Sequence, residues 1–370
     1  MSRERFKSNT SNSFFGHFLY AQVVPKDHFL VKLQEVVPWQ RFTYKLVKYY
    51  KGRGQLGRPP YDPAVILKML LLAYLYNVSE RQVEDLSNYY LPAKYLLGLG
   101  VNERAPDHST LSAFKKRIYE NGKLGAYYAL LRDVIDLAVE KGVKFGDLQI
   151  VDSTHSIADV NVAKDESRQK EGQAARDIHA RWGVKGSYEV HDEGGQKCKR
   201  KKAFFGYKQH ASMNAQAEMI TSVRHSSGNR TDGEFFCRLV ESDLAQGLPV
   251  DTYTADRAYD DSDNHVFLDS KGLHSALKLH SYRTQKKDDN KRVWLELEAS
   301  EHYQRGLKQR YKIERKFGEA KKEHGLGRCR FVGLAYYAIQ GILTAMVLNL
   351  KRLVALLTGV RFKGQARVLA

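Results

Sequence analysis

Cysteine is scarce in this sequence, and its scarcity excludes two kinds of cross-linked domain. The 370 residues include three cysteines, which lie far apart and form no C-x-x-C pair: Cys198, Cys237 and Cys329. Neither a disulfide framework nor a structural zinc site is supported, and a reducing cytoplasm fits this composition. The stretch "SRERFKSNTSNS" after Met1 is polar and lacks the apolar segment of a secretion signal, so we expect a protein that is not exported.

Long apolar runs are also missing. The two most apolar stretches are "AVILKMLLLAYLY" and "LAYYAIQGILTAMVLNL". Each is shorter or more polar than the ~20 apolar residues that a bilayer span needs. We expect both to form buried helices, and we expect no membrane among the partners of the chain.

Acidic residues are too few to balance the basic ones. Lys and Arg number 60 against 42 Asp and Glu, which gives a formal net charge of +18 and a pI near 9.6. The apolar share of 42% is ordinary for a globular protein with a sizeable core. A basic excess of this size implies a polyanionic partner, and nucleic acid is the strongest candidate.

Residues 1–142 have the pattern of a helical domain. Asp62 followed by Pro63 predicts a helix start at "YDPAVILKMLLLAY", because Asp caps a helix and Pro suits its first position. Ser79 and Gln82 form an S-x-x-Q capping box that opens the next helix. These signals predict an all-α N-terminal domain.

A third helix is expected at "DHSTLSAFKKRIYENG", with Ser109 or Thr110 as its cap. This helix carries Lys115, Lys116 and Arg117, and it follows two short helices joined by a tight turn. The arrangement resembles a helix-turn-helix region that would bind DNA. Short helix pairs are also common in simple bundles, so this pattern leaves both interpretations open.

From Val143 onward the pattern changes to short β-type runs: "LQIVD", "KAFFGYKQHASMNA", "EMITSVRH", "VDTYTAD" and "GLHSALKL". Helical stretches alternate with them, which predicts a mixed α/β domain over residues 143–350. The charged, glycine-rich segment at about 164–202 is expected to be a long mobile basic loop. Residues 351–370 are expected to form a basic C-terminal tail.

Three acidic residues stand out by position. Asp152 and Asp256 each follow a β-type run, so each marks the end of a predicted strand. In the helical stretch "KQRYKIERKFGEAKK", at about 100° per residue, Arg310 falls about 40° and Lys321 about 20° from Glu314. A carboxylate with two cations on its face can bind a metal while its neighbours hold a phosphate-bearing chain.

These motifs together resemble one family, the DDE transposases of bacterial insertion sequences, over most of the chain. The residues Arg310, Glu314 and Lys321 match three positions of the family's Y-x2-R-x3-E-x6-K helix, and Leu307 stands at the tyrosine position. "VDSTHSIADVN" and "TADRAYD" look like the two Asp motifs, and "FFGYKQH" like the strand between them. "RGQLGRPPYDPAVILKMLLLAYLYNVSERQVEDL" with "PDHSTLSAFKKR" is similar to the domain in front of many such cores.

The resemblance implies an α/β ribonuclease H-like catalytic domain preceded by an all-α N-terminal domain. It implies that Asp152, Asp256 and Glu314 bind two Mg²⁺ ions, for which Mn²⁺ substitutes, in cleavage at insertion-sequence ends and transfer of the 3′ hydroxyl into target DNA. The implied partners are the terminal inverted repeats, the target DNA and further copies of the chain at synapsis. The implied place of action is the bacterial nucleoid in the cytoplasm.

A set of basic side chains is expected to hold DNA near these carboxylates. Its members outside the N-terminal domain are Arg310, Lys321, Arg257, His155, Lys199, Arg200 and Lys201. His210 could also reach the substrate. The last three of the set belong to "KCKRKK", which could equally be a solvated loop.

Two other classes of function stay open at this point. One is a domesticated DNA-binding protein that keeps the fold without transposition, and the other is a stand-alone metal-dependent nuclease that cuts DNA without joining it. A single Asp at a strand end is usually a turn or cap residue, so the assignment depends on the ordered trio rather than on any one acid.

Overall fold

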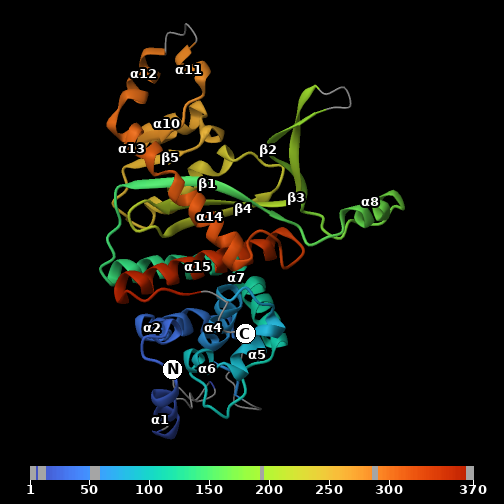
Figure 1. Ribbon diagram of the computed structural model, residues 1–370, viewed down its shortest axis with the longest axis vertical. Coiled ribbons are helices and arrows are strands. Elements are labelled where there is room, and N and C mark those ends of the chain that lie inside the picture. Colours follow the sequence, from blue (N-terminus) through green and yellow to red (C-terminus); the bar gives the residue numbers. More distant parts are fainter. Residues whose placement is uncertain (1–5, 7–13, 51–58, 192–195, 286–290, 364–370) are drawn as a thin grey trace. The chain divides into compact units, whose positions relative to one another are not determined.

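The computed structural model describes residues 6, 14–50, 59–191, 196–285 and 291–363. The chain divides into two compact units, and we treat each by itself (Figure 1). Unit 1 comprises residues 1–143 and 343–370, and unit 2 comprises residues 144–342. The first boundary falls at Val143, where the sequence changes from a helical to a β-type pattern.

The described residues of unit 1 form helices only. Besides a short 3-10 turn at Val47–Tyr49, these are α1 (Phe14–Val23), α2 (Phe29–Val36), α3 (Gln40–Leu46), α4 (Pro63–Leu75), α5 (Glu80–Tyr89), α6 (Leu91–Leu97) and α7 (His108–Glu140). The last helix of the chain, α15 (Leu334–Thr358), begins in unit 2 and belongs to unit 1 from Leu343 onward. The all-α prediction for the N-terminal domain is confirmed.

Two of the three predicted helix starts are confirmed. The Asp62 side chain accepts the Ala64 N–H at 2.8 Å at the start of α4. Ser79 and Gln82 form the reciprocal capping box of α5. The cap predicted for α7 was wrong by two or three residues.

At the start of α7 the capping residue is Asp107, not Ser109 or Thr110. Its carboxylate accepts the Thr110 N–H at 3.1 Å and the Ser109 hydroxyl at 2.6 Å. A charged carboxylate outcompetes a hydroxyl for this position because it also interacts favourably with the helix N-terminus.

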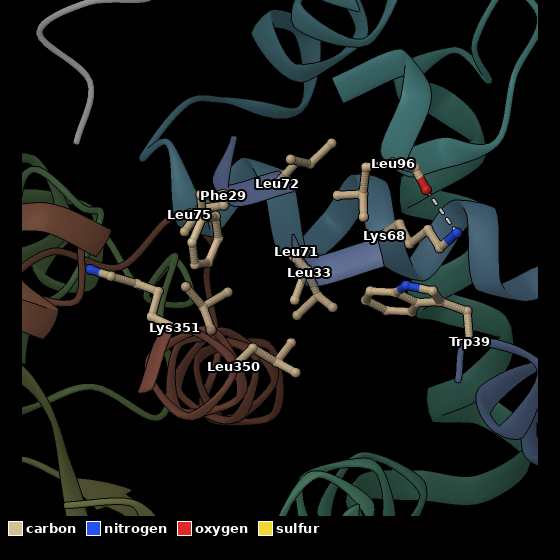
Figure 2. A pocket seen from close by; sticks show the side chains of 11 residues that line it. Phe29, Leu33, Trp39, Lys68, Leu71, Leu72, Leu75, Leu96, Leu350 and Lys351 are labelled. Carbon is tan, nitrogen blue, oxygen red and sulfur yellow. Dashed lines mark hydrogen bonds between the residues drawn. The ribbon is translucent and has the colours of Figure 1, made fainter. Parts of the chain in front are cut away.

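A buried lysine lies in the core of unit 1. Lys68 on α4 is 4% exposed, and its ammonium donates to the Leu96 carbonyl at 2.7 Å and to Gln34 at 3.0 Å. It also lies 5.0 Å from the ring centre of Trp39. Burial lowers the pKa of Lys68 to about 7. Figure 2 shows Lys68, Trp39 and Leu96 beside an apolar cavity of about 10 Å³, which has room for one water molecule.

We expect Lys68 to make the stability of the chain depend on pH. Because the folded-state pKa of Lys68, about 7, lies below the ordinary lysine value of 10.5, the unfolded chain binds more protons between these values. The stability of the wild type relative to Lys68→Met should therefore rise with pH across that window, by at most about 1.4 kcal/mol per pH unit. Urea denaturation of both proteins at several pH values measures this difference.

The exposed Lys141→Met change at the end of α7 is the control, and it should leave the pH dependence of stability as in the wild type. A constant difference between wild type and Lys68→Met across the window would show that Lys68 stays charged in the core.

Unit 2 is built on one six-stranded sheet. Its strands are β1 (Leu148–Ile157), β2 (Arg181–His191), β3 (Lys197–Asn214), β4 (Ile220–Ser227), β5 (Thr252–Ala255) and β6 (His274–Leu277). They lie in the order β2-β3-β1-β5-β6, and β4 pairs with β3. β1, β3 and β4 are antiparallel neighbours, whereas β1, β5 and β6 are parallel.

The described residues of unit 2 also form helices. They are α8 (Val162–Lys170), α9 (Phe236–Leu244), α10 (Ser262–Ser270), α11 (Ser281–Gln285), α12 (Lys291–Ala299), α13 (Glu301–Gln309) and α14 (Tyr311–His324), with 3-10 turns at Gly233–Phe235 and Arg257–Tyr259. Of these helices, α9, α10, α13 and α14 pack against the sheet. Val151 and Tyr253 pack with Phe236 of α9 on one face. In Figure 1, α14 runs across the opposite face, where α13 also packs.

Helix α13 approaches the sheet closely because residue 306 is glycine. A Cβ added there would lie 2.6 Å from the Cβ of Ala276 and 3.1 Å from the Cβ of Thr254. Leu307 packs beside it against the cluster of Ala276, Leu279 and Tyr303. The leucine at the family's tyrosine position therefore keeps this helix on the sheet.

Each of the five predicted β-type runs contains a strand, but the segment 164–202 differs from its prediction. Instead of a mobile loop it contains α8, the whole of β2 and the first part of β3. β2 escaped notice because its glycines and charges do not alternate cleanly with apolar residues, yet its backbone pairs with β3 over most of its length. Figure 1 shows the β2–β3 hairpin projecting beyond the other strands.

Both apolar stretches of the sequence form helices, α4 and α15. Within the described part of the chain, α15 alone is long and apolar enough to cross a membrane, and 67% of its most apolar window is buried inside the protein. The expected tail at 351–370 begins inside this helix, which continues to Thr358.

Candidate active site

The two aspartates lie where two parallel strands separate. The β1–β5 ladder ends with the pair Ile150 and Thr254, and Asp152 and Asp256 stand two residues further along their strands. Because side chains alternate along a strand, both aspartates project from the same face as Ile150 and Thr254. Thr254 faces Gly306, so this is the face that α13 and α14 cover. The strand register therefore brings the first two predicted acids together.

The sequence predicted that Asp152 lies at the end of a strand, and this prediction is wrong. β1 continues to Ile157, because β3 pairs with it up to the contact between Ile157 and Gly206. Asp152 instead lies at the point where β1 loses its other neighbour, β5. The apolar run stopped at this residue because one side of the strand becomes open there.

The carboxyl group of Asp152 is poorly compensated. One of its oxygens accepts the Ser153 N–H at 2.7 Å. Burial raises its pKa to about 7, assisted by repulsion from Asp256 and Asp232, while the Ser153 N–H and the charge of Arg310 oppose the rise. A negative site held in this way favours an added positive charge.

Asp256 follows the last residue of β5 and caps the 3-10 turn Arg257–Tyr259. One of its oxygens accepts the Ala258 N–H at 2.9 Å. This bond fixes the carboxylate beside Asp152. Arg257, the next residue, is exposed.

Asp232 is an acid that the sequence reasoning missed. It follows β4 and precedes the turn into α9, and it lies near enough to Asp152 to raise the pKa of that carboxyl group. Its carboxylate accepts Lys208 at 2.9 Å, and its distance to His210 is 3.7 Å. The signal was available, since Asp232 also stands between a predicted strand and a predicted helix.

Glu314 stands apart from the two aspartates. It lies in the first turn of α14, its side chain is 61% exposed, and its nearest cation is Arg310 at 3.8 Å. Arg310 has helical backbone angles at the junction of α13 and α14, so the single predicted helix is two helices that meet there. The predicted shared face of Arg310 and Glu314 agrees with this distance.

Lys321 and His155 form a polar contact beside Asp152. The Lys321 ammonium lies 3.3 Å from Nδ1 of His155. Burial and the charges of nearby lysines, Lys321 first, lower the pKa of His155 to about 4. Burial lowers the pKa of Lys321 to about 8, with Lys185 adding to the effect and Asp152 opposing it.

His210 has a structural environment. It is fully buried, contacts the Ser226 hydroxyl at 2.9 Å and stacks on Phe235 with 4.2 Å between ring centres. Burial lowers its pKa to about 4. The imidazole is therefore uncharged near neutral pH and has no open path to a substrate.

The other predicted DNA-binding residues lie in different settings. Lys199, Arg200 and Lys201 are exposed on the outer half of β3. On α7 Lys116 is exposed and pairs with Glu120 at 3.7 Å, while Arg117 lies 4.5 Å from the ring centre of Tyr50.

Lys115 does not fit the DNA-binding set proposed for α7. It is 2% exposed, and its ammonium forms an ion pair with Glu80 of α5. This pair ties α5 to α7 and leaves the lysine no access to a phosphate. The three consecutive basic residues looked alike in sequence, but a helix turns about 100° per residue and buries the first of them.

The two aspartates fit a divalent cation of the Mg²⁺ type. Both offer carboxylate oxygen, the donor that Mg²⁺ prefers, and their mutual repulsion would be relieved by a bound cation. Among the residues that the structure describes, no group of three or more His, Cys, Asp or Glu side chains is close enough to form a complete metal site. Glu314 is the member of the predicted trio that is not gathered with the others.

The sheet order and the paired aspartates define the class. An antiparallel β4-β3-β1 segment continued by parallel β5 and β6, with carboxylates on the two central parallel strands, is a ribonuclease H-like α/β domain. The predicted fold class is confirmed.

Family comparison then gives the assignment. Residues 145–350 match the family model described as "Transposase DDE domain", and residues 18–117 match the "Transposase domain (DUF772)". The chain belongs to the DDE transposase family.

Two solved structures show weaker likeness. A piggyBac transposase synaptic complex with hairpin DNA is 12% identical, with a TM-score of 0.27, over 71% of this chain and 50% of that one. A Mos1 transposase paired-end complex with left transposon end is 10% identical, with a TM-score of 0.20, over 84% of this chain and 93% of that one. The chain thus spans 50% of the piggyBac chain, and the assignment depends on the family models.

Asp152 should make the wild type less stable at high pH in metal-free buffer. The folded-state pKa of Asp152, about 7, exceeds the ordinary aspartate value of 3.8, so the folded chain binds the proton more tightly than the unfolded chain does. The stability from this group is full below the lower value and is lost as pH rises through about 7. Asp152→Asn carries no such proton, so its stability relative to the wild type should increase between about pH 4 and pH 7. Thermal unfolding in EDTA measures this, and an unchanged difference would contradict the raised pKa of the buried Asp152 carboxyl group.

Proposed function

We propose that this chain is a DNA transposase that cleaves DNA at insertion-sequence ends and transfers the resulting 3′ hydroxyl into target DNA. The observation that supports this most strongly is the pairing of Asp152 and Asp256 at the separation of β1 and β5. Membership of the DDE transposase family gives the reaction class. The ability to join, which distinguishes a transposase from a nuclease, is part of the proposal.

Asp152, Asp256 and Glu314 are the proposed ligands of two Mg²⁺ ions, with Mn²⁺ as a substitute. When bound, the metal supplies Lewis-acid stabilisation of the in-line displacement at phosphorus. The shared face of Asp152 and Asp256 at the end of the β1–β5 ladder supports this proposal. The Glu314 side chain is 61% exposed, and within the described part of the chain its ion-pair partner is Arg310 at 3.8 Å, so it can turn toward the aspartates.

The cations beside the carboxylates would hold the DNA. Arg310 interacts with both Asp152 and Glu314, and Lys321 lies within electrostatic range of Asp152. Each of these cations can therefore contact the DNA phosphate next to the one that binds at the carboxylates. Positioning of this kind accounts for a large part of the rate in phosphoryl transfer. Arg257, exposed next to Asp256, is a further candidate of the same kind.

The proposed partners are the terminal inverted repeats of the element and its target DNA, within the nucleoid. The net charge of +18 supports binding to a polyanion. Transposition has to bring two DNA ends together, and each chain carries one pair of central aspartates, so we expect two or more copies of the chain at synapsis.

Removal of any one of the three carboxylates should abolish DNA cleavage. Asp152→Asn, Asp256→Asn and Glu314→Gln keep the shape of the side chain but remove the charge that holds the metal. Binding to a DNA duplex should stay close to the wild-type level. Cleavage of an end-containing duplex in Mg²⁺ measures the first effect, and a labelled 3′ end followed into a target plasmid measures joining.

Wild-type cleavage by one of these variants would remove that residue from the metal site. Cleavage without any joining by the wild type would instead make the chain a nuclease.

Arg310→Met and Lys321→Met should lose cleavage or joining by ~10–1000-fold while keeping the fold, because a small error in substrate position is costly to the rate. Lys322→Met and Glu323→Gln, which are exposed on other faces of α14, are the controls and should cost far less. Circular dichroism checks the fold. Equal losses at Arg310 and Glu323 would mean that the face carrying Arg310 does not face the DNA.

A further inference from the structure

The outer half of β3 presents two faces of different character. Paired residues of antiparallel strands lie on the same face, so the contact between β1 and β3 places Lys208 on the face of His155. Side chains alternate along β3, and the even-numbered residues from Cys198 to His210 therefore share this face. Phe204 confirms the register, since its ring centre lies 4.7 Å from that of His155.

The alternation divides the basic run "KCKRKK" between the two faces. Arg200 and Lys202 lie on the face that leads to His155, whereas Lys199 and Lys201 lie on the other. The sequence had grouped these residues as one basic segment.

Lysines gather around His155 from three separate elements. Lys321 comes from α14, Lys202 from β3, and Lys185 from the bulge of β2 opposite it. All three are close enough to His155 to lower its pKa, and Lys185 is also close enough to lower that of Lys321. Nothing in sequence spacing connects them.

Among the residues that the structure describes, none of these three lysines forms an ion pair with a carboxylate, in contrast to Lys208, which pairs with Asp232 at 2.9 Å. Like charges held together are unfavourable unless an anion joins them. The lysine cluster therefore destabilises the folded chain unless an anion binds to it.

His155 is arranged as a hydrogen-bond donor within the same cluster. A lysine ammonium has donors only, so its contact with Lys321 makes Nδ1 of His155 the acceptor. The ring is neutral near physiological pH, because its pKa is about 4. Its proton therefore lies on Nε2, which can donate to an anionic oxygen.

We propose that Lys185 and Lys202 complete, with Lys321 and His155, a site for one backbone phosphate of DNA at the base of the β2–β3 hairpin. The inference extends the proposed function, because the strand held there would continue from the phosphate at Asp152. A phosphate oxygen suits three ammonium groups and one neutral N–H donor. The role of the hairpin is then to clamp the strand from the side opposite α14.

The test is the salt dependence of DNA binding by the full chain. We compare Lys185→Gln and Lys202→Gln with the wild type, using a labelled DNA duplex of random sequence. Each variant should reduce the slope of log K against log salt by about 1 and weaken binding about 8-fold at 0.1 M salt. Both lysines are exposed, so the substitutions should leave the fold intact.

Two further variants provide the comparison. Lys271→Gln removes an exposed lysine at the end of α10 and should keep the wild-type slope. Lys201→Gln removes the neighbouring charge on the opposite face of β3 and should change the slope less than Lys202→Gln does. Wild-type slopes for both Lys185→Gln and Lys202→Gln would overturn the proposal, as would equal losses at positions 201 and 202.

The result is separable from the test of catalysis. Reduced slopes in a chain that does not cleave DNA would support the phosphate site while the proposed reaction fails. Unchanged slopes in a chain that cleaves and joins normally would overturn the site and leave the reaction in place.

Discussion

Burial of the Asp152 carboxyl group near Asp256, where β1 and β5 separate, is the constraint on which the candidate site depends. The hydrophobic cluster around Tyr253 and Phe236 fixes the register of the two strands. That register places Asp152 and Asp256 on the same face of the sheet. Packing of apolar side chains thus supplies the energy that holds two like charges together. The metal-free chain is destabilised as a result, and a bound divalent cation would offset this destabilisation.

The surrounding charges are sorted by whether they are neutralised. Asp232 takes up Lys208, and Glu80 takes up Lys115, so these ions belong to the architecture. Lys321, Lys185 and Lys202 have no such partner among the described residues. An ion pair indicates a charge that stabilises the fold, so the lysines that have no such pair are the stronger candidates for binding a substrate.

Local signals in the sequence predicted much of this structure. Caps fixed the starts of α4 and α5, and apolar alternation located the five strands other than β2. The features that the sequence did not predict depend on contacts between distant segments. The extension of β1 beyond Asp152 requires pairing with β3, and the hairpin requires the pairing of β2 with β3. For the candidate site, spacing predicted Asp152, Asp256 and Glu314, and the structure gathers the first two. The positions of Lys185 and Lys202 depend on the pairing of β2 with β3, which spacing does not reveal.

The close approach at Gly306 has a consequence for the evolution of the chain. A single methyl group there would push α13 away from β5 and β6, and Arg310 and Glu314 follow within the next eight residues. The freedom of position 306 to vary is therefore tied to the placement of the helices that carry Arg310 and Glu314. Substitutions where α13 packs on the sheet are therefore restricted by the residues that follow on α13 and α14. Second-site mutations that restore activity after a larger residue replaces Gly306 should arise at Ala276 or Thr254, the side chains that a Cβ at position 306 would meet.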